Sequence, residues 1–218
     1  MVENVIPAQI FELTGGFLCL DFTNTVEDRP EAHPRELLNS YSDLVSWGQQ
    51  AHVLAGQEAQ WLLEEAARHP AETSRVLQRA VAIREAIYRI FKAVAEDALP
   101  GEEDLVSLSA AVADAQTHAR IVPKAGGFTW DWAGNPGDLD RMLWPVVRSA
   151  ADLLTSDELD DVRICASDAC NWLFLDTSKN HSRRWCDMKS CGNRAKARRF
   201  YGRKKSSLTV SQGLSQFP

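Results

Sequence analysis

Residues 163–205 read RICASDACNWLFLDTSKNHSRRWCDMKSCGNRAKARRFYGRKK. Four of the five cysteines lie in this stretch as two pairs, Cys165/Cys170 and Cys186/Cys191. Four residues separate the members of each pair, and fifteen separate the two pairs. Two short knuckles joined by a hairpin bring four soft thiolates around one tetrahedral Zn²⁺. The spacing therefore predicts a zinc site, one ion per chain, with these four cysteines as ligands.

The predicted site is structural. Four thiolate ligands leave no position for a reactive water, and a module of about forty residues has a thin core that a metal can secure. The apolar run Trp172–Leu175 between the knuckles is expected to form a buried strand beneath the metal. Two alternatives stay open at this point: a Cys₃His site that uses His181, and no metal at all.

The charge of the chain is divided unevenly between its two parts. The net charge is −6, but residues 161–218 hold twelve Lys and Arg against four Asp and Glu, a net charge of +8. Residues 1–160 consequently carry −14. A basic segment on an acidic body is typical of proteins in which only that segment meets nucleic acid.

A helix is expected from Gly192 to about Tyr201, with Gly202 as its end. Ala197, Phe200 and Tyr201 share one arc of it and could dock on the zinc module. No acidic residue occurs between Lys189 and Lys205. The run is either a solvated basic face or a surface for the phosphate backbone of DNA, and its position beside a rigid metal site favours the second reading. The candidate nucleic-acid-binding residues are Arg183, Arg184, Arg194, Lys196, Arg198, Arg199, Arg203, Lys204 and Lys205.

Residues 1–160 are predicted to be mainly α with a few short strands. Residues 17–22 follow Gly15-Gly16 as an apolar run, and a buried strand is expected there. Helical periodicity extends from Ser40 to a stop at Gly56, and then over residues 57–68, 76–99 and 105–119. Short strands are expected at 121–122 and 128–132. A last helix covers 138–155, where Pro145 should cause a kink.

Few polar residues of the body stand out as functional. Asp21, Asn24 and Thr25 could line a pocket for a small-molecule effector, although Asn24 or Thr25 capping a turn is the favoured interpretation. Cys19 has no partner nearby in sequence and is read as a buried packing thiol. The tryptophans of the body are expected to be core anchors: Trp47, Trp61, Trp130, Trp132 and Trp144.

Several function classes find no support. No apolar run reaches the length of a membrane span, and the N-terminus lacks the pattern of a signal peptide, so we expect a cytoplasmic protein with reduced cysteines. There is no Gly-rich phosphate loop, HExxH or GxSxG motif, and the five histidines are scattered. We therefore expect that the protein is not an enzyme.

Residues 165–205 closely resemble the CGNR zinc finger, whose name is spelled by residues 191–194. The flanking WLFLDTS (172–178) and RRWC (183–186) are also similar to that family. CLDFTNTV (19–26) and the helical body resemble the ABATE domain that commonly precedes this finger. The resemblance implies a stress-responsive bacterial transcription regulator whose finger binds DNA.

The expected architecture is an α-helical ABATE-like domain over residues 1–157, a small treble-clef-like zinc module over 158–206, and a tail over 207–218. The expected function is DNA-binding transcription regulation, with the body sensing an effector or mediating assembly such as a homodimer. An RNA- or protein-binding adaptor is the alternative, in which Trp185 and Tyr201 would stack on bases.

Overall fold

The computed structural model describes residues 9–135, 137–198 and 200–201. As predicted, the chain is mainly helical with a few short strands. The helices are α1 (Leu18–Thr23), α2 (Tyr41–Gln50), α3 (Gly56–Arg68), α4 (Pro70–Ala95), α5 (Glu102–Gln116) and α6 (Leu143–Leu154). Three antiparallel pairs join β1 (Val26–Glu27) to β2 (Arg35–Glu36), β3 (Ala119–Lys124) to β4 (Gly127–Trp132), and β5 (Val162–Ile164) to β6 (Leu173–Leu175). A 3₁₀ turn, η1 (Asp157–Asp161), precedes β5, and a π turn, η2 (Met188–Gly192), precedes a helix over residues 193–198 and 200–201.

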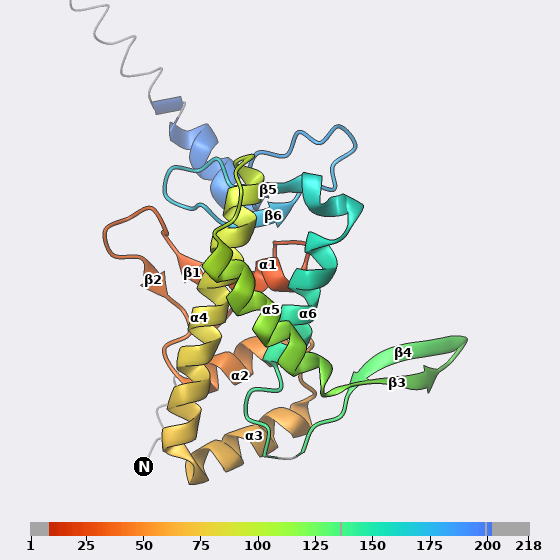
Figure 1. Ribbon diagram of the computed structural model, residues 1–218. Helices are drawn as coiled ribbons and strands as arrows, with labels where there is room; N and C mark the ends of the chain where they lie inside the picture. The colour runs from red at the N-terminus through yellow and green to blue at the C-terminus, as the bar shows by residue number, and fades with distance from the viewer. Residues whose placement is uncertain (1–8, 136, 199, 202–218) are drawn as a thin grey trace, which may run out of the picture.

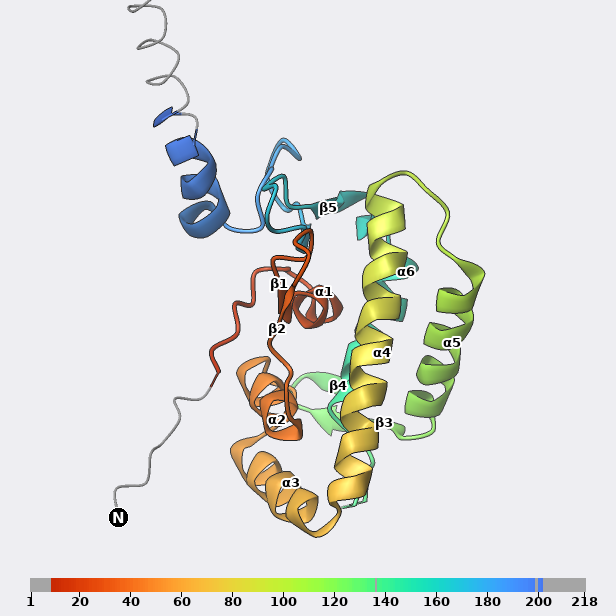
Figure 2. The same ribbon diagram turned by 90° about the vertical axis from the view of Figure 1, so that its left-hand side faces the viewer.

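Helix α4 is the central helix of the body and contacts each of its other helices. It runs nearly the height of the molecule, with α5 and α6 alongside it and α2 and α3 at its lower end (Figures 1 and 2). Its buried residues, such as Ala80, Ile87 and Ile90, recur at helical spacing and belong to the main core. The helix was predicted from Val76, yet it begins at Pro70, because a proline at the first helical position lacks only an N–H that needs no intrahelical partner.

The strand predicted at residues 17–22 is wrong, because this segment forms the short helix α1. Cys19, Leu20 and Phe22 are fully buried there, and α1 packs against α4, α6 and β6. The segment is short and apolar except for Asp21, and periodicity cannot distinguish such a buried helix from a buried strand. Cys19 is a buried thiol, as expected, and burial raises its pKa to about 12.

Two further predictions need correction. Gly56 begins α3 instead of ending the preceding helix, which already stops at Gln50. Pro145 lies in the first turn of α6, because the helix starts at Leu143 and not at residue 138. The predicted kink is therefore wrong, since the N–H groups of a first helical turn have no intrahelical acceptor to lose.

The β3–β4 hairpin was predicted correctly and extends away from the helical body (Figure 1). Of the tryptophans expected in the core, Trp47 and Trp144 are buried there, and Trp61 and Trp132 pack partly buried against it. Trp130, on the hairpin, is 49% exposed, so the expectation of a core anchor is wrong for this residue.

The β5–β6 hairpin belongs to two cores at once. Leu173 and Leu175 are buried in the main core of the body, whereas Trp172 and Phe174 belong to a second cluster with the four cysteines. This division follows the two-residue period of a strand, which sends alternate side chains to opposite faces. The predicted buried strand beneath the cysteines is confirmed, and the zinc module is built directly on the body.

Candidate metal centre and nucleic-acid interface

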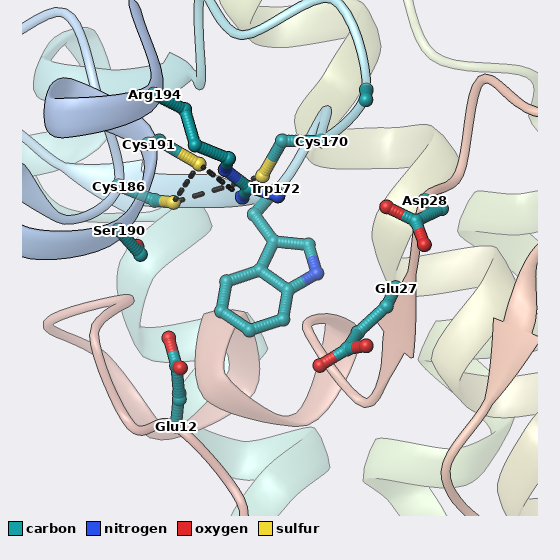
Figure 3. Close-up of a pocket in the computed structure, with 10 residues that line it drawn as sticks. Glu12, Glu27, Asp28, Cys170, Trp172, Cys186, Ser190, Cys191 and Arg194 are labelled. Carbon is teal, nitrogen blue, oxygen red and sulfur yellow. Dashed lines mark hydrogen bonds between the residues drawn. The ribbon is translucent and has the colours of Figure 1, made fainter. Parts of the chain in front are cut away.

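The four cysteines predicted as ligands converge on one point. Cys170 Sγ and Cys191 Sγ each lie 3.7 Å from Cys186 Sγ, and all four sulfur atoms lie within 4.8 Å of one another (Figure 3). All four side chains are buried. Zinc–sulfur bonds of about 2.3 Å in a tetrahedron place the sulfur atoms about 3.8 Å apart. The group can therefore hold one zinc ion.

The electrostatics of the group also fit a cation. Hydrogen bonds from Cys170 and Cys186 lower the pKa of the Cys165 thiol. The same contact raises the pKa of Cys170 and of Cys186, because each thiol donates to the Cys165 thiolate and a second negative charge there is unfavourable. Four thiolates this close together require a positive charge between them, which Zn²⁺ supplies when bound.

Backbone hydrogen bonds hold the two knuckles in shape. Cys165 N–H donates to the Trp172 carbonyl oxygen at 2.8 Å, and Cys170 N–H donates to that of Ser167 at 3.0 Å. In the second knuckle, the Asp187 carboxylate accepts from the Ser190 N–H at 2.8 Å and caps η2. Contacts within the chain thus hold both knuckles in shape without involving a metal.

The CGNR residues have distinct positions around Cys191. Gly192 is buried, and a Cβ atom added to it would lie 2.8 Å from the Met188 sulfur. Asn193 donates from Nδ2 to the Lys189 carbonyl oxygen at 3.0 Å. Arg194 donates from Nη2 to Cys191 Sγ at 3.1 Å, and this hydrogen bond raises the pKa of its guanidinium. Arg194 therefore stabilises thiolate charge at the metal site.

His181 does not belong to the ligand group. Its Nδ1 lies 2.6 Å from Asp161 Oδ1, and the converging ligand atoms are those of the four cysteines. Of the two ligand sets weighed from the sequence, the geometry therefore favours the all-cysteine set.

Two family models match the chain along its length. The ABATE model, described as "Putative stress-induced transcription regulator", matches residues 16–157, and the CGNR zinc finger model matches residues 162–204. The chain belongs to the ABATE family. The resemblance seen in the sequence is thereby confirmed for both parts of this ABATE protein. No curated protein matches it.

The basic helix of the ABATE protein stands out from the rest of the molecule. Figures 1 and 2 show it leaving the second knuckle and pointing away from the helical body. Arg194, Lys196 and Arg198 are exposed on it, and Arg198 Nη1 lies 2.9 Å from Asp168 Oδ2 of the first knuckle. The other predicted contacts, the Arg199 side chain with Arg203, Lys204 and Lys205, lie outside the described residues.

Arg183 and Arg184 differ in what they are free to contact. The Arg183 guanidinium lies 4.4 Å from the Phe174 ring centroid and donates to the Trp185 carbonyl oxygen and to that of Thr14. It therefore has a structural role between module and body. Arg184 is exposed, with its guanidinium 5.6 Å from the Trp185 ring centroid.

Phe200 and Tyr201 do not dock on the module as expected. They are 65% and 68% exposed, and their rings contact each other with centroids 5.6 Å apart. The helix extends beyond the zinc module, so Phe200 and Tyr201 have no surface of the module's described residues to pack against.

Asp21, Asn24 and Thr25 are engaged in contacts within the chain. Asp21 accepts from the Gly15 N–H at 2.7 Å, and the Thr25 hydroxyl donates to the Phe22 carbonyl oxygen at 2.8 Å. Asn24 is buried and bonds to the Leu173 backbone. Their placement supports a structural role at the end of α1 more than an effector pocket.

Sequence reasoning missed the acidic side chains that face the finger. A cavity of about 230 Å³ lies between body and module. Glu12, Glu27 and Asp28 line it from the body, and Trp172 and Arg194 line it from the module (Figure 3). These carboxylates lie more than 130 residues before the zinc module in the chain, and no local sequence pattern places them beside it.

None of the described helices has the length and apolar composition of a membrane-spanning segment.

Proposed function

We propose that this ABATE protein is a DNA-binding transcription regulator whose basic helix contacts the phosphate backbone. The observation that supports this most directly is the exposed position of Lys196 and Arg198 on a helix that projects from the zinc module. Cations held in a fixed array neutralise successive phosphates and release condensed counterions. The zinc ion holds the base of this helix, because Cys191 is both a ligand and the residue from which the helix continues.

The charge distribution supports an interaction restricted to this end of the molecule. Residues 161–218 carry a net charge of +8, whereas residues 1–160 carry −14. A phosphate polymer is attracted by the first segment and repelled by the second, so the acidic body orients the finger toward DNA. Arg184, exposed beside the second knuckle, would extend the contact.

The remaining parts of the proposal follow from the family. We assign the zinc finger to residues 158–206 and the ABATE domain, in a sensing or assembly role, to residues 1–157. The matching families are of regulator and zinc-finger type, which supports binding and not catalysis. A bacterial cytoplasm is the compartment in which such a regulator and its reduced cysteines would act.

The test is selection of bound sequences from a random duplex DNA library, followed by anisotropy titrations of the selected duplex at several salt concentrations. The variant Lys196→Gln/Arg198→Gln should bind more weakly, and the slope of log K against log salt should fall by about 1.8, or about 0.9 for each lost contact. Arg68→Gln/Arg75→Gln, which removes two cations from the acidic body, is the matched control and should keep the wild-type slope.

Unchanged affinity and slope in the finger variant would move the contact to another surface. A wild-type chain with full zinc content that enriches no duplex would count against a sequence-specific regulator.

One observation favours single-stranded RNA as a second candidate ligand. Phe200 and Tyr201 are exposed beside the cations of the helix, and exposed aromatic rings stack on unpaired bases. Stacking contributes about 1–3 kcal/mol per base. If RNA is the ligand, Tyr201→Ala should weaken binding to a single strand by about fivefold or more and leave binding to duplex DNA nearly unchanged.

A further inference from the structure

The β3–β4 hairpin has one face that is entirely apolar. Its register pairs Ala119 with Trp132, Ile121 with Trp130 and Pro123 with Phe128. Directly paired residues of an antiparallel ladder point to the same side of the sheet, and residues two apart along a strand share a face. The apolar face therefore consists of Ala119, Ile121, Pro123, Phe128, Trp130 and Trp132.

The opposite face carries all the charged residues of the two strands. Arg120 is paired with Asp131 in the register and donates to its carboxylate from Nε at 2.8 Å. Lys124, at the tip, lies on this side as well. A hairpin that is polar on one face and apolar on the other has the pattern of a sheet that is covered on one side.

The body covers the apolar face at the base of the hairpin but not at its tip. Trp132 packs against the main core, with its ring centroid 6.1 Å from that of Trp144. Farther out, the guanidinium of Arg148 lies 4.2 Å from the Trp130 ring centroid. Ile121, paired with Trp130, is 64% exposed, and Phe128, nearer the tip, is 72% exposed. Figure 1 shows the hairpin extending away from the body. An isolated two-stranded hairpin in water is marginally stable, so this arm needs a partner layer.

We propose that the partner is a second copy of this chain, whose hairpin packs with its apolar face on the same face of the first. A two-fold contact brings a patch onto itself, and any charge in the patch would meet its like. The six residues of the apolar face carry no charge, and among them Arg148 reaches only Trp130, so the outer part of the face is self-complementary. The acidic body is not self-complementary, because residues 1–160 carry −14 in each copy and like charges repel.

The available area sets the strength of this dimer. A large apolar side chain buries on the order of 150–250 Å² when fully covered, and Ile121, Phe128 and Trp130 are each covered to about half or less. Together with Pro123, the face can remove roughly 300–500 Å² per copy from solvent, or about 600–1,000 Å² in total. Stable interfaces bury more than about 1,200 Å². The contact therefore gives a reversible dimer that forms with increasing protein concentration.

Oligomeric state is measured on the zinc-loaded full chain, without DNA, by sedimentation velocity from roughly 1 to 100 μM. The wild type should shift from monomer toward dimer over this range. Phe128→Asp places a charge from each copy within the apolar contact and should weaken the dimer by at least tenfold. Thr129→Asp adds the same charge one residue away on the opposite face, and its monomer–dimer equilibrium should match the wild type. Zinc content and far-ultraviolet circular dichroism check that both variants are folded.

A photo-reactive residue at position 128 identifies the surface directly. Cross-links between copies should map to residues 119–132. A wild type that stays monomeric at every concentration, a dimer that survives Phe128→Asp, or cross-links confined to other segments would each overturn the proposal. Capture of a different protein by this residue, with no cross-link between copies, would also overturn it. Since no nucleic acid is present, the outcome is independent of whether the basic helix binds DNA.

Discussion

The side chain of Asn24 and the backbone of Leu173 form two hydrogen bonds across 149 residues of sequence. Asn24 Nδ2 donates to the Leu173 carbonyl oxygen at 2.9 Å, and Asn24 Oδ1 accepts from the Leu173 N–H at 3.0 Å. Just before Leu173, Trp172 Nε1 donates to the Val26 carbonyl oxygen and the Tyr88 hydroxyl donates to that of Asn171. Three consecutive residues before and within β6 are thus bound to the body.

Replacing Asn24 with alanine should destabilise body and module together. The change leaves both polar groups of the Leu173 backbone buried without partners, at a cost of about 1–3 kcal/mol for each. We expect a loss of about 2–4 kcal/mol in the free energy of unfolding, measured by urea titration. Asn39→Ala, at an exposed site, should cost less than about 1 kcal/mol. An Asn24→Ala chain as stable as the wild type would show that these bonds contribute nothing.

Zinc should be present at one ion per chain, and Cys186→Ser should release it. Because Leu173 and Leu175 belong to the main core, loss of the metal should lower the melting temperature of the helical body as well as loosen residues 163–205. For a chain of this size, a loss of about 2 kcal/mol corresponds to a shift of about 4–8 °C. Elemental analysis and calorimetry measure the two effects.

The control for zinc content is Cys19→Ala, which removes a thiol that lies in the body core and outside the ligand group. This variant should lose stability from its cavity and retain one zinc per chain. A stoichiometric metal that persists when all four ligand cysteines are replaced would refute the assignment.

Arg84 is a buried cation whose removal should be costly. It is 2% exposed and forms two bonds with the Glu36 carboxylate, at 2.6 and 2.7 Å, and one with Glu85 at 2.8 Å. Arg84→Met leaves Glu36 without this partner, whereas Glu85 keeps Arg29, and we expect a loss of about 1.5–3 kcal/mol. Arg79→Met, on the same helix, removes a half-exposed side chain with ion pairs to Asp114 and Asp140 and should cost less, about 1 kcal/mol. Equal effects of the two changes, read from urea unfolding, would contradict this difference.

Asp21 gives the stability of the chain a specific pH dependence. Burial raises the pKa of Asp21 from 3.8 to about 6, and the hydrogen bond from the Gly15 N–H offsets only part of this effect. Since the unfolded chain loses the proton first, stability falls as pH rises from about 4 to 6 and then levels off. Asp21→Asn should remove this decline and make the chain about 3 kcal/mol more stable at pH 7 but not at pH 4. Urea unfolding at both values checks it, and an equal effect at both would contradict it.

The zinc ligands were predictable because their spacing is local. Two cysteines separated by four residues form a knuckle whatever the rest of the chain does, and the apolar run at 172–175 marked the strand beneath them. The long helix α4 was likewise visible from its period, which Ala80, Ile87 and Ile90 follow over several turns.

What escaped prediction depends on contacts distant in sequence. The segment at 17–22 is a helix because α4, α6 and β6 enclose it, and none of these is adjacent in sequence. Asn24 was considered as a residue that lines an effector pocket, because nothing near it in the sequence indicates that its hydrogen-bond partner is Leu173. The structural role of Arg183 was hidden for the same reason, because Phe174 and Thr14 reach it only in the folded chain.

The β5–β6 hairpin contributes side chains both to the main core and to the cysteine cluster. The free energy of unfolding of the helical body should therefore depend on the concentration of free zinc. A ligand that binds only the folded form stabilises it by RT ln(1 + [L]/Kd), and this term applies to every element that unfolds together with the site. A chelator should consequently lower the melting temperature of α4 and α6, although neither contains a ligand. The protein would register metal depletion through its folded fraction, by mass action alone.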